Sequence, residues 1–203
     1  CLERHGMCDA VIGLQASGDG DVKRLANECV LKCGILQMVC GDVGADDGVV
    51  CAAGCSRLRR TLQACLSDAV AAIVTDGDTP GHVVRLLTSD IPSVAEDCAA
   101  CIGLLGTQMK AAAAIAQALD DAHVRDASSD GLLFCPLVSV LKANGEGRVV
   151  VGVLAVIQRV VEAGRKRCDE RGRNPCLMCL ERHGMCDAVI GLQASGDGDV
   201  KRL

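Results

Sequence analysis

Apolar residues recur at steps of three and four along nearly the whole chain, which is the period of amphipathic helices. In residues 21–39 these positions form one predicted buried stripe, with Lys23, Asn27 and Lys32 outside it and Asp21 as the expected N-cap. The same period occurs in CDAVIGLQASG (8–18), HVVRLLTSD (82–90), IPSVAEDCAACIGLLG (91–106), MKAAAAIAQALDDAHV (109–124), LFCPLVSVLKANG (133–145) and VVVGVLAVIQRVVEAG (149–164). The pattern predicts an all-α protein.

The first 25 residues, CLERHGMCDAVIGLQASGDGDVKRL, occur again without change at residues 179–203. We interpret residues 1–178 as one complete tandem unit and residues 179–203 as the start of the next identical one, within a segment of a longer array. A deliberate duplication of the two ends is the alternative. A solenoid repeat usually has about 20 to 50 residues, so each tandem unit should contain about four diverged repeats.

Three stretches resemble armadillo repeats, in which a short first helix is followed by a second helix and a longer third. They are LERHGMCDAVIGLQASGDGDVKRLANECVLKCG, HVVRLLTSDIPSVAEDCAACIGLLG and PLVSVLKANGEGRVVVGVLAVIQRVVEAG, and VCAAGCSRLRRTLQAC (50–65) resembles part of a fourth. Second helices would start near residues 9, 56, 82, 136 and 187. HEAT repeats fit the same pattern.

The resemblance implies a right-handed α-solenoid whose third helices line a concave surface. No polar cap covers either end of the chain, so we expect chains to stack end to end. In import-receptor armadillo proteins, Trp and Asn ladders bind peptides. Here the Trp places match Glu28 and Ala100, and the Asn places match Lys32, Leu104 and Arg159. A surface carrying Glu28, Lys32, Leu104 and Arg159 would bind another partner, unless these residues are only solvated faces.

The composition narrows the classes of function. There is no Trp or Tyr and a single Phe, and the net charge of −5 is mixed in sign, which argues against a nucleic-acid binder. The longest apolar stretch, Val149 to Ile157, is too short for the ~20 residues that cross a bilayer, so no membrane is expected. Despite its valines we predict that it is helical. Two of the fifteen cysteines lie in the second copy, which leaves thirteen in residues 1–178. An odd number cannot pair fully, so we expect reduced thiols and an intracellular, cytoplasmic or cytoskeletal/ciliary location.

Cys176, Cys179, His183 and Cys186 are four zinc-type ligands at steps of three, four and three. An unbroken helix would spread them over about 15 Å, so they could bind zinc only if Gly184 ends the helix. Otherwise they form the packed stripe of a repeat helix. Cys98 and Cys101 have CxxC spacing within a helical pattern and lack the context of a redox loop.

No nucleophile motif or phosphate-binding loop is present, so we expect neither catalysis nor a cofactor. The favoured function is a protein-interaction scaffold that self-associates with other copies of the same unit, as a filament or a cytoskeletal or ciliary array. Two alternatives are an adaptor that binds one peptide in its groove and a zinc- or redox-responsive Cys-rich module.

Overall fold

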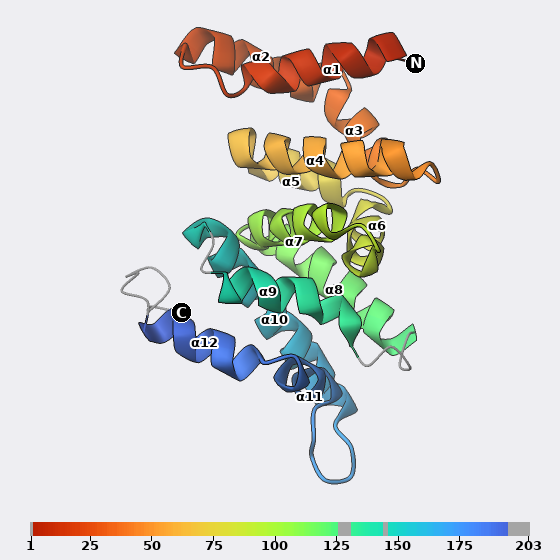
Figure 1. The fold of residues 1–203 in the computed structure, drawn as a ribbon, viewed down its shortest axis with the longest axis vertical. Helices are drawn as coiled ribbons and strands as arrows, with labels where there is room; N and C mark the ends of the chain where they lie inside the picture. The colour runs from red at the N-terminus through yellow and green to blue at the C-terminus, as the bar shows by residue number, and fades with distance from the viewer. Residues whose placement is uncertain (1, 126–130, 144–145, 195–203) are drawn as a thin grey trace. The chain divides into compact units, whose positions relative to one another are not determined.

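The computed structural model describes residues 2–125, 131–143 and 146–194, with only the backbone for residues 2–5 and 194. Every regular element in these ranges is a helix, which confirms the all-α prediction (Figure 1). The chain divides into two compact parts, residues 1–79 and residues 80–203, and each is described by itself. None of the described helices is long and apolar enough to cross a membrane.

The N-terminal part contains five helices in its described residues. They are α1 (Leu2–Leu14), α2 (Gly20–Lys32), α3 (Ile35–Val43), α4 (Gly48–Cys65) and α5 (Asp68–Thr75). The side chains of Asp19, Asp47 and Ser67 cap α2, α4 and α5 by accepting hydrogen bonds from backbone N–H groups. Helix α3 packs on α4, and α1 packs on both α2 and α4.

The single helix expected over residues 21–39 is wrong, because the chain breaks at Gly34. Gly34 has a φ of 72°, a left-handed conformation that favours glycine, and it separates α2 from α3. The N-cap of α2 is Asp19, not Asp21. The predicted stripe is only partly buried: Ala26 and Val30 lie in the core, whereas Leu25 is 53% exposed.

The C-terminal part holds the remaining described elements, apart from the first residue of α6. They are α6 (Thr79–Arg85), η1 (Leu86–Thr88), α7 (Pro92–Gly106), α8 (Met109–Arg125), η2 (Leu132–Phe134), α9 (Cys135–Lys142), α10 (Gly147–Gly164), η3 (Arg165–Arg167), α11 (Pro175–Arg182) and α12 (Met185–Ala194). The Val-rich stretch is helical, as predicted, and forms much of α10.

Helices α7 and α10 form the centre of the C-terminal part, and α8 also packs on α10. Three glycines allow the backbones of α7 and α10 to touch: Gly103 and Gly106 face Gly152, with no room for a Cβ atom at any of them. Such close contact of two helices excludes water from the apolar residues around it, including Leu105, Val149 and Val153.

The predicted starts of second helices agree with the structure only in part. Starts near residues 82, 136 and 187 lie close to the beginnings of α6, α9 and α12. Residues 9 and 56 instead lie inside the continuous helices α1 and α4. The division of each repeat into three helices is therefore wrong at those two places.

Candidate functional site: the two copies of one segment

The duplicated segment has two different backbone conformations. In the first copy, α1 runs without interruption through Gly6. In the second copy the identical sequence is divided between α11 and α12, and the break lies at Gly184, whose φ is 84°. Local sequence is the same in both places, so the surrounding contacts decide where the helix ends.

In the first copy, the buried side chains of the segment face the N-terminal part. Cys8 and Ile12 are buried where α1 packs on α2 and α4. Gln15 is also buried, and its Nε2 donates to Asn27 Oδ1 at 3.0 Å and to Cys65 Sγ at 3.2 Å. The opposite side of α1 is open, since Met7 is 58% exposed.

An ion-pair network holds the first copy on α4. Arg57 donates from Nη2 to Asp9 Oδ2 at 2.8 Å and from Nη1 to Asp42 Oδ2 at 3.2 Å. Arg60 reaches Asp9 Oδ1 at 3.3 Å. Hydrogen bonding from Arg57 is the largest cause of the lowered pKa of Asp9. The buried guanidinium of Arg57 thus has carboxylates from two other helices as partners.

The second copy buries a different set of side chains. Helix α12 packs on α9, and its buried residues are Met185, Ala188 and Leu192. Met185 is only 9% exposed, whereas its counterpart in the first copy, Met7, is 58% exposed. Ile190 is 63% exposed, although its counterpart, Ile12, is 3% exposed. The two copies therefore bury side chains at different positions of the same sequence.

Polar contacts fix the turn between α11 and α12 against α9. His183 Nδ1 lies 3.1 Å from the Sγ atom of Cys135, at the start of α9. Lys142, at the end of α9, donates from Nζ to the backbone oxygen of His183 at 3.2 Å. The cation thus sits where α11 leaves backbone carbonyls without helical partners. Burial raises the pKa of Cys135, which keeps this thiol protonated near neutral pH.

The two buried sets lie on different faces of one helix. With 3.6 residues per turn, the face of Cys8 and Ile12 is about 150° from the face that corresponds to Met185, Ala188 and Leu192. Residues 7–14 and 185–192 are helical in both copies. The two faces can therefore be covered at the same time by different neighbours.

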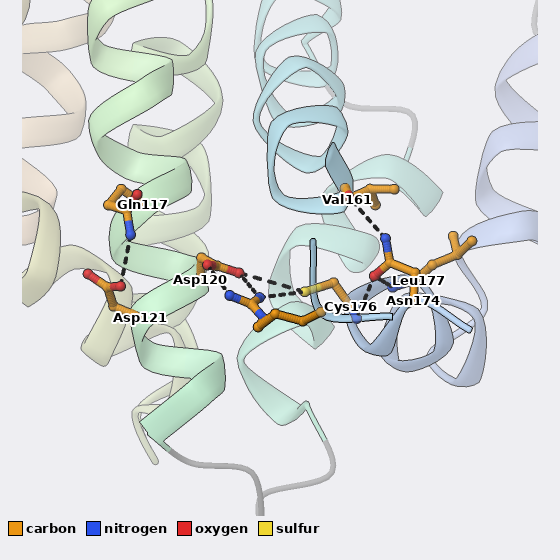
Figure 2. A network of polar contacts seen from close by, with 8 residues as sticks. Gln117, Asp120, Asp121, Val161, Asn174, Cys176 and Leu177 are labelled. Carbon is orange, nitrogen blue, oxygen red and sulfur yellow. Dashed lines mark hydrogen bonds and ion pairs between the residues drawn. The ribbon is translucent and has the colours of Figure 1, made fainter. Parts of the chain in front are cut away.

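A second polar network fixes the start of α11, directly before the second copy (Figure 2). Asn174 caps α11 by accepting from the N–H groups of Cys176 and Leu177, and it donates to the backbone oxygen of Val161 at 2.7 Å. The buried Cys176 thiol lies 3.8 Å from Asp120 Oδ1. These contacts connect α11 to α8 and α10.

Asp120 and Arg167 are the charged centre of this network. Two hydrogen bonds join the guanidinium to the carboxylate, one of 2.6 Å between Nη1 and Oδ2. Hydrogen bonding from Arg167 is the main cause of the lowered pKa of Asp120. Burial raises the pKa of the Cys176 thiol, which remains a neutral donor toward Asp120.

Three of the four zinc-type ligands have different neighbours. Cys176 lies beside Arg167 and Asp120, His183 contacts Cys135, and Cys186 is exposed. Among the described residues, no three His, Cys, Asp or Glu side chains are placed to hold a metal ion. Gly184 does end the helix, but the resulting turn packs on α9. The fourteen described cysteines are free of disulfides.

The candidate partner-binding residues differ in their environments. Leu104 is fully buried in α7, where almost the whole circumference of the helix is covered, so its expected place on a binding surface is wrong. Glu28 on α2 pairs with Arg24 at 2.9 Å and with Lys32 at 3.2 Å, in the i,i+4 arrangement of a solvated helix face. Arg159 is half-buried on α10 in the other part of the chain.

Sequence reasoning missed Arg57, Cys135 and Lys142 as contacts of the duplicated segment. Each lies about 40 to 50 residues from its partner, as in the separations of 48 for Asp9 to Arg57 and 41 for Lys142 to His183. The helical period has no information on pairs at that distance. The duplication itself was the signal that the segment has two neighbours.

The structure resembles two solved repeat proteins of artificial origin. A designed armadillo repeat protein is 15% identical, with 95% of this chain and 94% of that chain covered and a TM-score of 0.50. An engineered protein is 14% identical, with coverage of 96% and 92% and a TM-score of 0.47. No family model matches the sequence, and no curated protein is significantly similar. The chain has an all-α, armadillo-like repeat fold.

Proposed function

We propose that this protein is a non-catalytic scaffold in which identical 178-residue tandem units are joined through the duplicated segment. In such an array the helix of residues 7–14 packs with one face on α2 and α4 of its own tandem unit. Its other face packs on α9 of the preceding tandem unit, as α12 packs on α9 in this chain. The function is protein–protein interaction or spacing.

The observation that carries this proposal is the opposite burial of Ile12 and Ile190 and of Met7 and Met185. A helix that served only as the edge of a domain would need one apolar face. This sequence has two, and each is covered in one of the copies. An internal helix of a repeat array has this property, because it has a neighbour on both sides.

Identical tandem units would present identical surfaces at a constant interval. This favours a periodic partner, and we propose a filamentous, cytoskeletal or ciliary array inside the cell, which includes other copies of the same unit. An extended lattice offers the repeated binding sites that such a scaffold needs. The exposed ion pairs of Glu28 with Arg24 and Lys32 would recur in each tandem unit of the scaffold.

Chains with one, two and three tandem units, each followed by residues 179–203, test the proposal. Small-angle scattering should give a maximum dimension that rises by the same increment for each added unit. Met185→Asp at each junction should abolish the constant increment, since that side chain is buried against the preceding unit. Gly191→Ala is the matched control, because position 191 and its counterpart, Gly13, are exposed. Units that scatter as flexibly linked beads would contradict the proposal.

A further inference from the structure

Each copy of the duplicated segment has one bare apolar face. The first copy leaves Met7 and Leu14 exposed, and the second leaves Cys186 and Ile190 exposed. The counterparts of these four residues are buried in the other copy. The chain therefore has two docking sites for one helix sequence, the site on α2 and α4 and the site on α9.

One charge of the segment also fits the site on α2 and α4. Asp9 pairs with Arg57 and Arg60 at the site on α4, and its counterpart Asp187 is exposed. The exposed face of α12 therefore presents the acidic and apolar groups that α4 binds in the first copy. Because residues 185–192 are already helical, this face needs no refolding to dock.

Polar contacts also anchor the second copy, and the residues directly before it, on their own side. Asn174 caps α11, Cys176 lies in the Asp120–Arg167 network, and Lys142 binds the turn at His183. The helix α12 can thus keep its place on α9 while its other face binds elsewhere. In the first copy, α1 is a separate helix that packs on α2 and α4.

We propose that α12 of one chain replaces α1 of a second chain on α2 and α4, which joins the chains head to tail by segment exchange. The proposal rests on the function proposed above, because it places the same junction between two chains. The partner is a second copy of this chain.

Exchange exposes one copy of the helix for each copy that it buries, so the unaltered chain gains little apolar burial from it. The first copy is tethered to α2, and a tethered helix acts at an effective concentration in the ~mM range. The unaltered chain should therefore stay largely monomeric at micromolar concentration. A change that weakens only the first copy should shift the balance to exchange.

Ile12→Asp weakens the first copy and leaves the second copy intact. Sedimentation velocity at micromolar concentration should show a shift from monomer to a ladder of dimers and larger species. Ile190→Asp, the same substitution at an exposed position, should leave the chain monomeric. The double variant Ile12→Asp/Ile190→Asp should lose the ladder, since neither copy then fits the site on α4. Synthetic GMCDAVIGLQASG, the sequence of residues 6–18, should dissolve the oligomers of the single variant.

A monomeric Ile12→Asp variant would overturn the exchange, and so would equal association of the single and double variants. Oligomers that persist in excess peptide would also overturn the exchange, because they would be nonspecific aggregates. The function proposed above has a separate readout in the unaltered chain. It fails if Met185→Asp leaves the amides of residues 185–192 as protected from hydrogen exchange as before, whatever the oligomer measurement gives.

Discussion

Arg167 and Asp120 are joined by two hydrogen bonds, although they lie 47 residues apart in the sequence. The carboxylate is buried on α8, and the guanidinium follows the end of α10. Cys176 at the start of α11 contacts both groups. One ion pair therefore connects three helices directly before the second copy of the duplicated segment.

Asp120→Asn should lower the free energy of unfolding by about 1 to 2 kcal/mol at pH 7, a value reduced by the partial exposure of Arg167. The folded state lowers the pKa of Asp120, so its contribution is complete above the ordinary carboxylate pKa of about 4. It is lost as the pH falls through the lower, folded value. Urea unfolding of both proteins at pH 7 and at pH 3 measures this.

The difference between the unaltered chain and Asp120→Asn should therefore shrink at pH 3. Arg173→Ala is the control, because its partner Asp169 is exposed and the pair is screened by solvent. That variant should unfold as the unaltered chain does. A difference for Asp120→Asn that stayed constant from pH 7 to pH 3 would show that the carboxylate charge does not stabilise the fold.

The contact of α7 with α10 should be sensitive to a single methyl group. Gly152→Ala places a Cβ atom against the backbone oxygen of Gly103, where neither helix can yield without moving. We expect a loss of about 3 kcal/mol or more in the free energy of unfolding. Gly41→Ala on α3 is the control, since its site is exposed and open, and it should gain up to about 1 kcal/mol. Equal stability of the two variants would contradict the close crossing.

The helical period predicted most of the helices, including the Val-rich α10, since amphipathic patterns depend only on local sequence. It did not predict the break at Gly34 or the difference between Gly6 and Gly184. The residues around Gly6 and Gly184 are identical, so no local pattern could distinguish these two glycines. The contacts of the turn with Cys135 and Lys142 join segments that are far apart in the sequence and exist only in the folded chain.

The candidate sites were predicted less well than the fold. Leu104 was assigned to a surface by matching helix positions, but α7 is apolar around nearly all of its circumference, so its sequence distinguishes no outer face. The four zinc-type ligands do have helical spacing in the sequence, at steps of three, four and three. In the folded chain, Cys176 and His183 each contact a side chain from another helix.

Leu192 and Leu14 occupy the same position of the duplicated segment and should respond differently to truncation. Leu192 is buried where α12 packs on α9, so Leu192→Ala should destabilise α12 by about 2 to 3 kcal/mol. Leu14 is half-exposed, and Leu14→Ala should cost less than about 1 kcal/mol. Hydrogen exchange of the amides in α12 and in α1 measures the two effects separately. Equal costs would mean that both copies are packed alike.

Cys8 and Cys186 also share a position, and they should differ in reactivity toward iodoacetamide. Cys8 is fully buried and burial raises its pKa, so little of it is thiolate and little of it is accessible. Cys186 is exposed. Trypsin releases the same peptide, HGMCDAVIGLQASGDGDVK, from residues 5–23 and from residues 183–201. Mass spectrometry of that one peptide therefore reports on both cysteines together.

Alkylation of this peptide in the folded chain should proceed in two phases of equal amplitude, with the fast phase from Cys186 and the slow phase from Cys8. Cys8→Ala should change the mass of one copy and leave the remaining cysteine peptide with the fast phase alone. Cys186→Ala should leave the slow phase alone. Labelling in 6 M guanidinium should abolish the difference, since the local sequences are identical. A single phase in the folded, unaltered chain would mean that the two copies do not differ in burial, and the two-sided packing of the segment would then be excluded.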